Sequence, residues 1–271
     1  MIRNSFIFLD KISSKTEQNL WQQGITDWND FLKIKEINGI SPKRKAYYNR
    51  KLQEAKQELQ KDNSAYFAQI LPKKETWRLY QYFKEEACFL DLEVDSYGKI
   101  ILLGIADEYQ TKIFVKGFNL EKELIKKELN RYKLIITFNG SAFDLPKLKK
   151  QLQLEIKIPH LDLKPLCINL DLKGGLKEVE KKLNLNRPQH LRGSPVDLWK
   201  AFHASGDQEW LDLLIAYNQE DVENLKRIAD YCYLQLSITK IREMDFRDAG
   251  DGTVSHNLKK YSGAVSPYLY P

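Results

Sequence analysis

From residue 87 onward, short apolar segments alternate with amphipathic ones, and this order restricts the fold more than any other feature of the chain. Strand-like segments cover residues 87–94, 100–107, 112–116, 134–138 and 160–163. Turn residues separate the first three of them, which predicts an antiparallel meander. Helical patterns cover residues 120–130, the segment from about Phe143, and residues 175–183, 195–204, 208–217 and 221–236. The order predicts an α/β layered domain with a mixed sheet flanked by helices.

The chain before residue 85 has helical patterns. Residues 7–32 predict two short helices around a turn, with Gly24 ending the first helix and Thr26 capping the second. This segment is similar to a degenerate helix-hairpin-helix module in which residues 12–16 replace the usual Gly-x-Gly hairpin. Because glycines let backbone N–H groups approach a phosphate, their loss leaves two interpretations open, packing alone or contact with nucleic acid.

Positive charge is concentrated in one segment. The whole chain has a net charge of +6, but residues 33–84 alone carry +8, while residues 1–32 and 85–271 carry −1 each. A glycine-free helix is predicted over residues 42–61. The basic residues that we expect to contact a phosphate backbone are Lys43, Arg44 and Lys45.

Aromatic residues are interleaved with cations at the end of the basic segment. The aromatic and apolar members are Tyr66, Phe67, Trp77, Leu79, Tyr80, Tyr82 and Phe83. Such interleaving is typical of surfaces that stack on bases beside phosphate contacts. Aromatics at helical spacing also pack in cores, so a helical connector packed on the next domain is the alternative.

The cysteine and hydropathy patterns disfavour several classes of protein. The three cysteines, Cys88, Cys167 and Cys232, contain no CxxC pair, which disfavours a disulfide framework or a zinc cluster. The first apolar run is only four residues long and ends before Asp10, and no window approaches the roughly 18 apolar residues of a membrane span. We therefore expect a cytoplasmic protein with no membrane association.

Carboxylates mark three segments of the predicted α/β domain. Asp91 and Glu93 lie two apart on a strand, so they project from one face while their apolar neighbours face the core. Asp144 follows the fourth strand in the first turn of a helix, at the end of an α/β unit where ligands usually bind. Tyr217 and Asp221 lie four apart and share one face of a helix. Each segment taken singly also fits an ordinary acid on a surface or at a helix terminus.

The three segments together have a recognisable order. Asp-x-Glu on a first strand, Asn-x-x-x-x-Asp after a later strand and Tyr-x-x-x-Asp on a late helix resemble the tyrosine-bearing branch of the DEDD superfamily of 3′-to-5′ exonucleases. The chain is further similar to the ribonuclease H-like exonucleases of the YprB type over residues 135–144, 160–163, 174–183 and 196–199. The resemblance covers about residues 85–236.

The resemblance implies a ribonuclease H-like fold and hydrolysis of phosphodiester bonds at single-stranded 3′ ends. The implied catalytic residues are Asp91, Glu93, Asp144, Tyr217 and Asp221. The four carboxylates would hold two Mg²⁺ or Mn²⁺ ions, while Tyr217 would orient the attacking water. Asn139 would contact the terminal nucleotide, and Leu92 would contact its base or sugar.

Four polar residues near these segments are assigned structural positions. Asp162 follows the family pattern, and a helix cap or structural hydrogen bond is favoured for it over a place beside the metals. The histidines His160, His190 and His203 lack partners at ligand spacing, so we expect structural or surface roles for them.

The expected organisation is a helical N-terminal region over residues 1–84, a ribonuclease H-like exonuclease domain over residues 85–238 and a C-terminal tail over residues 239–271. The expected partner is single-stranded DNA or RNA with a 3′ end, DNA being slightly favoured, and the sequence names no protein partner. Two other functions stay open: a noncatalytic nucleic-acid-binding or scaffold protein on an exonuclease fold, and a structure-specific endonuclease.

Overall fold

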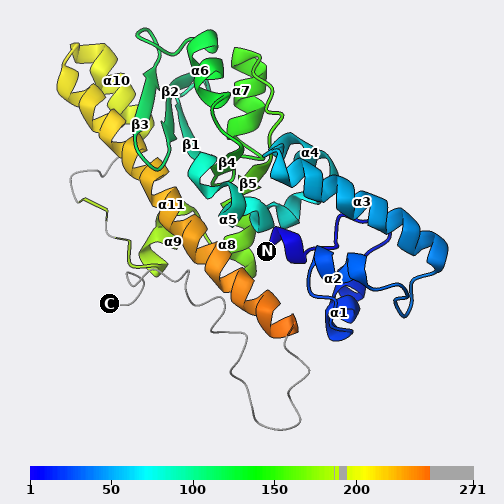
Figure 1. Cartoon of the computed structure of the whole chain (residues 1–271). Helices are drawn as coiled ribbons and strands as arrows, with labels where there is room; N and C mark the ends of the chain where they lie inside the picture. The colour runs from blue at the N-terminus through cyan, green and yellow to red at the C-terminus, as the bar shows by residue number, and fades with distance from the viewer. Residues whose placement is uncertain (186, 189–193, 245–271) are drawn as a thin grey trace. The chain divides into compact units, whose positions relative to one another are not determined.

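The structure is a computed structural model that describes residues 1–185, 187–188 and 194–244. The chain divides into two compact units, one made of Arg3–Gln53 with the segment that begins at Leu234, the other made of Glu54–Tyr233. Helices α3 (Pro42–Gln60) and α11 (Gln208–Met244), both labelled in Figure 1, include residues assigned to each of the two units. The part of the predicted tail up to Met244 is helical, while residues 245–271 and His190 lie outside the described residues.

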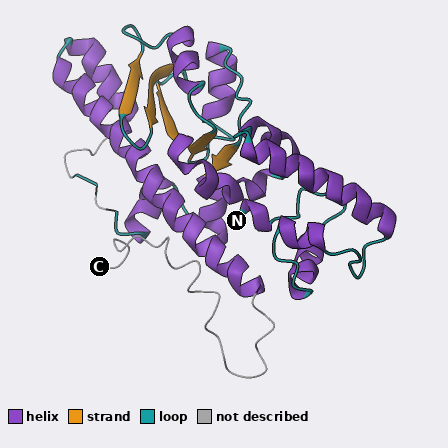
Figure 2. Ribbon diagram, in the orientation of Figure 1, coloured by secondary structure: helices purple, strands orange, loops and turns teal. Residues whose placement is uncertain are grey.

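A mixed five-stranded sheet forms the centre of the larger unit (Figure 2). Its strands are β1 (Ala87–Val94), β2 (Ile100–Ala106), β3 (Thr111–Val115), β4 (Leu134–Thr137) and β5 (His160–Asp162). The order across the sheet is β3-β2-β1-β4-β5, in which the first three strands form an antiparallel meander and β4 and β5 run parallel to β1. The predicted α/β fold with a mixed sheet is confirmed.

Helices cover both faces of this sheet. On one face, α6 (Lys122–Leu129) and α7 (Asp144–Leu152) pack against it through a core that includes Leu90, Leu92, Leu103, Ile125, Ile135 and Leu148. On the other face, α10 (Pro195–Ser205) and the first part of α11 pack through a core that includes Ile101, Leu102, Val115, Trp199, Leu211 and Leu214. Cys88, Leu90 and Leu92 alternate along β1 and all belong to the first core, as the period of a strand requires. In β2 the alternation is interrupted, because the consecutive residues Ile101 and Leu102 both belong to the second core, where the pairing with β1 is irregular.

The remaining helices of the larger unit are short. They are α4 (Ser64–Ile70), η2 (Lys73–Leu79), α5 (Tyr80–Phe83), η3 (Lys84–Glu86), α8 (Leu163–Asn169) and α9 (Leu176–Lys182). Helix α8 was not predicted. The helical pattern predicted over residues 208–217 and on through residues 221–236 forms the single helix α11, because residues 218–220 include neither glycine nor proline and continue the helix.

The aromatic residues before the sheet pack inside the larger unit. Phe67, Trp77, Tyr80 and Phe83 are buried. The hydroxyl of Tyr80 donates to Asp230 Oδ1 at 3.0 Å. The alternative interpretation, a connector whose aromatics pack in the core, is therefore correct for these four residues, and base stacking is not.

The smaller unit begins with a short helix pair. Besides η1 (Ile2–Asn4), the N-terminal segment contains α1 (Ser14–Gln22) and α2 (Trp28–Lys33), as predicted. Residues 12–16, which replace the usual Gly-x-Gly hairpin, begin α1: Ser13 caps this helix by accepting from Thr16 N at 3.2 Å. The cap expected at Thr26 is wrong, because Asp27 caps α2 by accepting from Asp30 N at 2.8 Å.

Indole and carboxylate hydrogen bonds hold the N-terminal segment inside the smaller unit. Trp21 Nε1 donates to Asn4 O at 3.0 Å, and Trp28 Nε1 donates to Ser5 O at 2.7 Å. The buried Glu17 carboxylate accepts from Phe6 N at 2.7 Å. These indole and carboxylate groups therefore form hydrogen bonds within the smaller unit.

Across the described ranges, no helix combines the length and the apolar character that a membrane span requires. The three cysteines are free and buried.

Candidate active site

Strand β1 carries the first two carboxylates of the site. Its register pairs Asp91 with Gly104 of β2, and the pairing becomes irregular between Glu93 and Val94, near the end of the strand. Asp91 and Glu93 are two residues apart, so both side chains leave the same face, as predicted. Because the neighbouring Leu92 is buried in the opposite core, the orientation of both acids is fixed by packing.

Helix α11 brings Tyr217 and Asp221 to the same face. Tyr217 and Asp221 are both buried and lie one helical turn apart. Between them, the buried Asn218 donates Nδ2–H to Asp91 Oδ2 at 2.8 Å. The helix approaches the sheet closely because Gly104 has no side chain: a Cβ at this position would lie 2.0 Å from Asn218 Oδ1.

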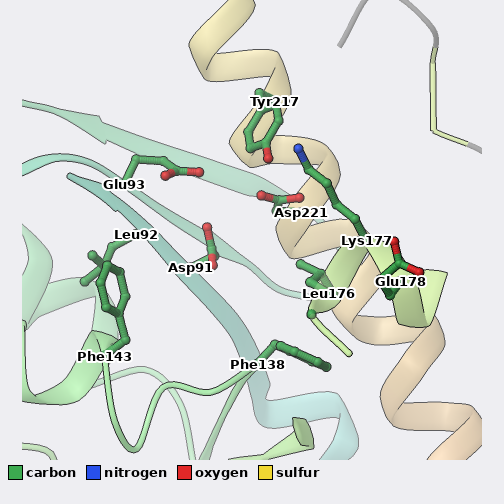
Figure 3. Close-up of a pocket in the computed structure, with 11 residues that line it drawn as sticks. Asp91, Leu92, Glu93, Phe138, Phe143, Leu176, Lys177, Glu178, Tyr217 and Asp221 are labelled. Carbon is green, nitrogen blue, oxygen red and sulfur yellow. The ribbon is translucent and has the colours of Figure 1, made fainter. Parts of the chain in front are cut away.

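Three carboxylates converge in the space between β1 and α11. One oxygen each from Asp91, Glu93 and Asp221 lies within 4.8 Å of the other two (Figure 3). Hard carboxylate oxygens at this spacing are the donors that Mg²⁺ and Mn²⁺ prefer. The residues present therefore fit a divalent cation.

Asp144 takes a different position from these three carboxylates. It begins α7, is buried, and its Oδ1 accepts from the backbone N–H of Leu92 at 3.2 Å. It is not a member of the group that lies within 4.8 Å, although its charge raises the pKa of both Asp91 and Glu93. Burial raises the pKa of Asp144 itself to about 7. The structure thus brings three of the four predicted metal ligands together and places the fourth beside them.

The carboxyl groups disfavour one another's ionisation. Burial raises the pKa of Asp91 well above its usual range, and the charges of Asp221 and Glu93 raise it further. Burial and the nearby Asp221 raise the pKa of Glu93 to about 8. Burial raises the pKa of Asp221 to about 6, against the opposing effect of Arg187. A bound divalent cation would relieve this repulsion by favouring the ionised forms.

Two cations lie at the α11 side of the site. The Arg187 guanidinium forms an ion pair with Asp221 and lies 5.1 Å from the centre of the Tyr217 ring. Lys177 Nζ lies 4.7 Å from the same ring centre (Figure 3). Neither residue was predicted from the sequence to belong to the site.

The carboxylates line a pocket of about 370 Å³. Its other lining residues are Leu92, Phe138, Phe143, Gly175, Leu176, Lys177, Glu178 and Tyr217. One side of the pocket is therefore acidic, while Leu92, Phe138 and Phe143 give another side an apolar character (Figure 3). A ligand with a charged group and a flat apolar group matches both sides.

Comparison with known proteins identifies the family. Residues 88–233 match RNase_H_2 of the RNase_H superfamily. The chain belongs to the RNase H superfamily. A further match, 32% identical over 118 residues, is to DNA polymerase 1 of Sulfurisphaera ohwakuensis, and it covers 39% of this chain and 14% of that polymerase. Membership of the superfamily, together with the acidic cluster, supports a metal-dependent nuclease hydrolase.

In this RNase H-like domain, the predicted substrate contact Asn139 shapes a turn. Asn139 has a positive φ of 67°, and its backbone N–H donates to Asp162 Oδ1 at 2.7 Å. Its side chain is not among those that line the pocket, whereas the aromatic residues Phe138 and Phe143 on either side of the turn are. Leu92 does line the pocket, as the prediction for it requires.

Asp162 and His160 support the same turn from β5. Asp162 caps α8 by accepting from Lys164 N at 3.2 Å, which confirms the structural position expected for it. His160 Nε2 lies 2.8 Å from Thr137 Oγ1, and burial lowers the pKa of His160 to about 4. His160 is thus a neutral structural partner at neutral pH, and His203 packs edge-to-face against Trp199 with ring centres 4.5 Å apart.

The three basic residues predicted to bind the phosphate backbone lie on α3, in the part assigned to the smaller unit. Lys43 and Arg44 are exposed. Lys45 is buried, donates to Asn49 Oδ1 at 2.6 Å and lies 4.6 Å from the centre of the Phe31 ring. Lys45 is therefore occupied by internal packing, and only Lys43 and Arg44 of the three present their charges to solvent.

Sequence reasoning missed Asn218, although a signal for it exists. On α11 the buried positions Leu214, Val222 and Leu225 form an apolar stripe, and Asn218 interrupts this stripe with an amide. A polar residue inside such a stripe needs a hydrogen-bond partner, which here is Asp91. For Arg187 and Lys177, the sequence contains no corresponding pattern.

Proposed function

We propose that the chain is a divalent-metal-dependent 3′-to-5′ exonuclease that hydrolyses phosphodiester bonds at single-stranded nucleic acid ends. One observation carries the proposal: Asp91 and Glu93 of β1 meet Asp221 of α11 within 4.8 Å, while Tyr217 lines the same pocket. These residues are far apart in the chain but lie together in the structure. Their order along the chain resembles the order of the motifs in the tyrosine-bearing exonucleases. The preferred substrate is a single strand of DNA or RNA.

The carboxylates would act as the metal ligands. Two Mg²⁺ or Mn²⁺ ions, when bound, supply an activated water and stabilise the charge that develops on the leaving 3′ oxygen. Asp91, Glu93 and Asp221 contribute oxygens from two sides of the site, and Asp144 would complete the set from the start of α7. Asn218 holds Asp91 in the required orientation through its 2.8 Å hydrogen bond.

Tyr217 would position the attacking water. Burial and the neighbouring Asp221 raise the pKa of Tyr217 above its usual value, so its phenol keeps its proton and acts as a hydrogen-bond donor. A phenol in this state orients water and does not act as a general base. The apolar side formed by Leu92, Phe138 and Phe143 would receive the terminal base.

Most of the nonspecific affinity would come from the basic N-terminal region. The catalytic residues are acidic and repel phosphates until cations bind, whereas residues 33–84 carry a net charge of +8. Lys43 and Arg44 are exposed on α3 and are suited to bind the phosphate backbone, the role predicted for them from the sequence. DNA is favoured only slightly over RNA.

The experiment that tests this function uses labelled oligonucleotides. Single-stranded DNA and RNA, each labelled at the 5′ or the 3′ end, are incubated with the protein in Mg²⁺ or Mn²⁺. A 3′-to-5′ exonuclease converts the 5′-labelled strand to a descending ladder and releases the 3′ label as a mononucleotide at once. Cleavage of a circular single strand would instead indicate an endonuclease, and intact strands with normal binding would indicate a noncatalytic binding protein.

A further inference from the structure

The Arg187 side chain donates a hydrogen bond to Asp221, one of the three carboxylates that would hold a metal. Its Nη2 donates to both Asp221 Oδ1 and Glu180 Oε1, the latter at 2.8 Å, while its Nε donates to Glu180 Oε2 at 3.1 Å. The Arg187 side chain is only 13% exposed and that of Glu180 only 3%. A bidentate pair of this kind fixes the guanidinium in place.

The Glu180 carboxylate is held in place by a further hydrogen bond, so it is a fixed partner for Arg187. Its Oε1 also accepts from Asn224 Nδ2 at 3.1 Å, and Asn224 lies on α11 one turn after Asp221. The guanidinium can therefore release Asp221 and still keep its second partner. The contact with Asp221 is the replaceable one of the two.

A guanidinium and a divalent cation repel each other when both bind the same carboxylate. Both are positive, and at the short distances of an ion pair in a partly buried site their repulsion is weakly screened. Asp221 contributes to the three-carboxylate cluster and accepts from Arg187 at the same time. Among the described residues, Arg187 Nη1 has no hydrogen-bond partner, so the pair with Glu180 and Asp221 accounts for all of its hydrogen bonds.

We propose that Arg187 is a positioning residue that holds Asp221 in the metal-free protein and competes with the divalent cation for this carboxylate. The inference rests on the metal site of the proposed function. In the absence of metal, Arg187 places a positive charge against Asp221 and holds this carboxylate in position through their ion pair. When the metal binds, Arg187 withdraws to its bidentate contact with Glu180.

This competition has a thermodynamic consequence. Only the fraction of molecules in which Asp221 is released from Arg187 is competent to bind metal, and the apparent affinity is reduced by that fraction. If about nine-tenths of metal-free molecules keep the contact, removing it raises the affinity about tenfold. The same removal lowers the stability of the metal-free protein, because Asp221 loses its counter-charge.

The test is calorimetric titration of the full chain with Mn²⁺ alone. Arg187→Ala is expected to lower the Mn²⁺ dissociation constant about tenfold and to lower the melting temperature measured in EDTA. Arg187→Lys keeps the charge but cannot bind Glu180 through a fork and reach Asp221 together, so an intermediate constant is expected. This variant keeps the test informative if Arg187→Ala does not fold.

Two control variants separate competition from general effects. Arg131 pairs with the buried Glu128 at 2.6 Å outside the pocket, so Arg131→Ala should lower the melting temperature and leave the Mn²⁺ constant unchanged. Lys177 lines the pocket without a hydrogen bond to Asp221 among the described contacts, so Lys177→Ala should lower the constant less than Arg187→Ala does. An equal effect in Lys177→Ala would show general charge repulsion and would overturn the proposal.

Other results are equally decisive. An unchanged or weaker Mn²⁺ affinity in both Arg187 variants overturns the inference, whether or not the wild type cleaves. If the wild type binds no Mn²⁺ at this site, with a titration identical to that of Asp221→Asn, the metal site fails and both proposals fall with it. Metal binding that depends on Arg187 without any cleavage of oligonucleotides would remove the exonuclease and keep the competition.

Discussion

A methyl group placed at Gly104 tests how the site is built. In Gly104→Ala the new Cβ would lie 2.0 Å from Asn218 Oδ1, 3.1 Å from its Cγ and 3.2 Å from Val222 Cγ1. Ordinary contact requires at least about 3.4 Å, so the Asn218 side chain or α11 must move by about 1.4 Å. Either movement disturbs the hydrogen bond from Asn218 to Asp91.

The expected size follows from these contacts. Overpacking a well-packed core costs about 1 to 3 kcal/mol, and a lost buried hydrogen bond costs about 1 kcal/mol or more. We therefore expect Gly104→Ala to lower the free energy of unfolding by about 2 to 3 kcal/mol. For a unit of this size the melting temperature should fall by about 4 to 12 °C. Because Tyr217 and Asp221 lie on the displaced helix, turnover should fall by about 100-fold.

Calorimetry in EDTA, on single and double variants, measures this effect. In a cycle of Gly104→Ala with Asn218→Ala, the second substitution makes room for the methyl group. The double variant should therefore lose at least about 1 kcal/mol less than the sum of the single losses. If Gly104→Ala stays within about 0.5 kcal/mol of the wild type, or the cycle is additive, the close approach of α11 to β2 is not what shapes the site.

Three other predictions concern charge and proton position. Burial raises the pKa of Asp91 and brings that of Glu93 to about 8, and a carboxyl whose folded pKa is raised loses its stabilising contribution as the pH rises. The free energy of unfolding of the metal-free protein should therefore fall between about pH 4 and pH 8. At pH 8 the Asp91→Asn variant should be more stable than the wild type by at least about 1 kcal/mol. A lower melting temperature of this variant at pH 8 would contradict the repulsion between the carboxylates. Tyr217→Phe should slow single-turnover cleavage about tenfold or more while calorimetry finds the Mn²⁺ affinity unchanged, and loss of metal binding would mean that its role is wrongly assigned. Replacing Lys43 and Arg44 by Gln should reduce the slope of log affinity against log salt by about 2, and an unchanged slope would exclude these residues from strand binding.

The periodicity of strands and helices was enough to predict which candidate site residues share a face. The alternation around Asp91 and Glu93 predicted that both acids share a face, and the four-residue spacing predicted the same for Tyr217 and Asp221. These features depend only on local backbone geometry. The mixed sheet likewise followed from the order of apolar segments, because a meander followed by alternating helices has few arrangements available.

The sequence did not reveal features that depend on tertiary contact. The approach of Asn218 to Asp91 requires the helix and the sheet to pack closely at Gly104, and no local pattern records it. Arg187 reaches Asp221 from a segment outside the described helices and strands. The N-cap of α2 was also not predictable from the sequence, because Thr26 and Asp27 are both favourable caps. The reciprocal hydrogen bonds between Asp27 and Asp30 make Asp27 the cap.

The most direct test of the central claim compares nucleotide release by the wild type and by Asp221→Asn. Both proteins are given a 5′-labelled single-stranded oligonucleotide in Mn²⁺, with circular dichroism and melting curves to establish that the variant is folded. We expect the wild type to release nucleotides and Asp221→Asn to release none above the EDTA control, because the variant lacks one of the three converging carboxylates. Full activity in the folded Asp221→Asn protein would contradict the metal-dependent account.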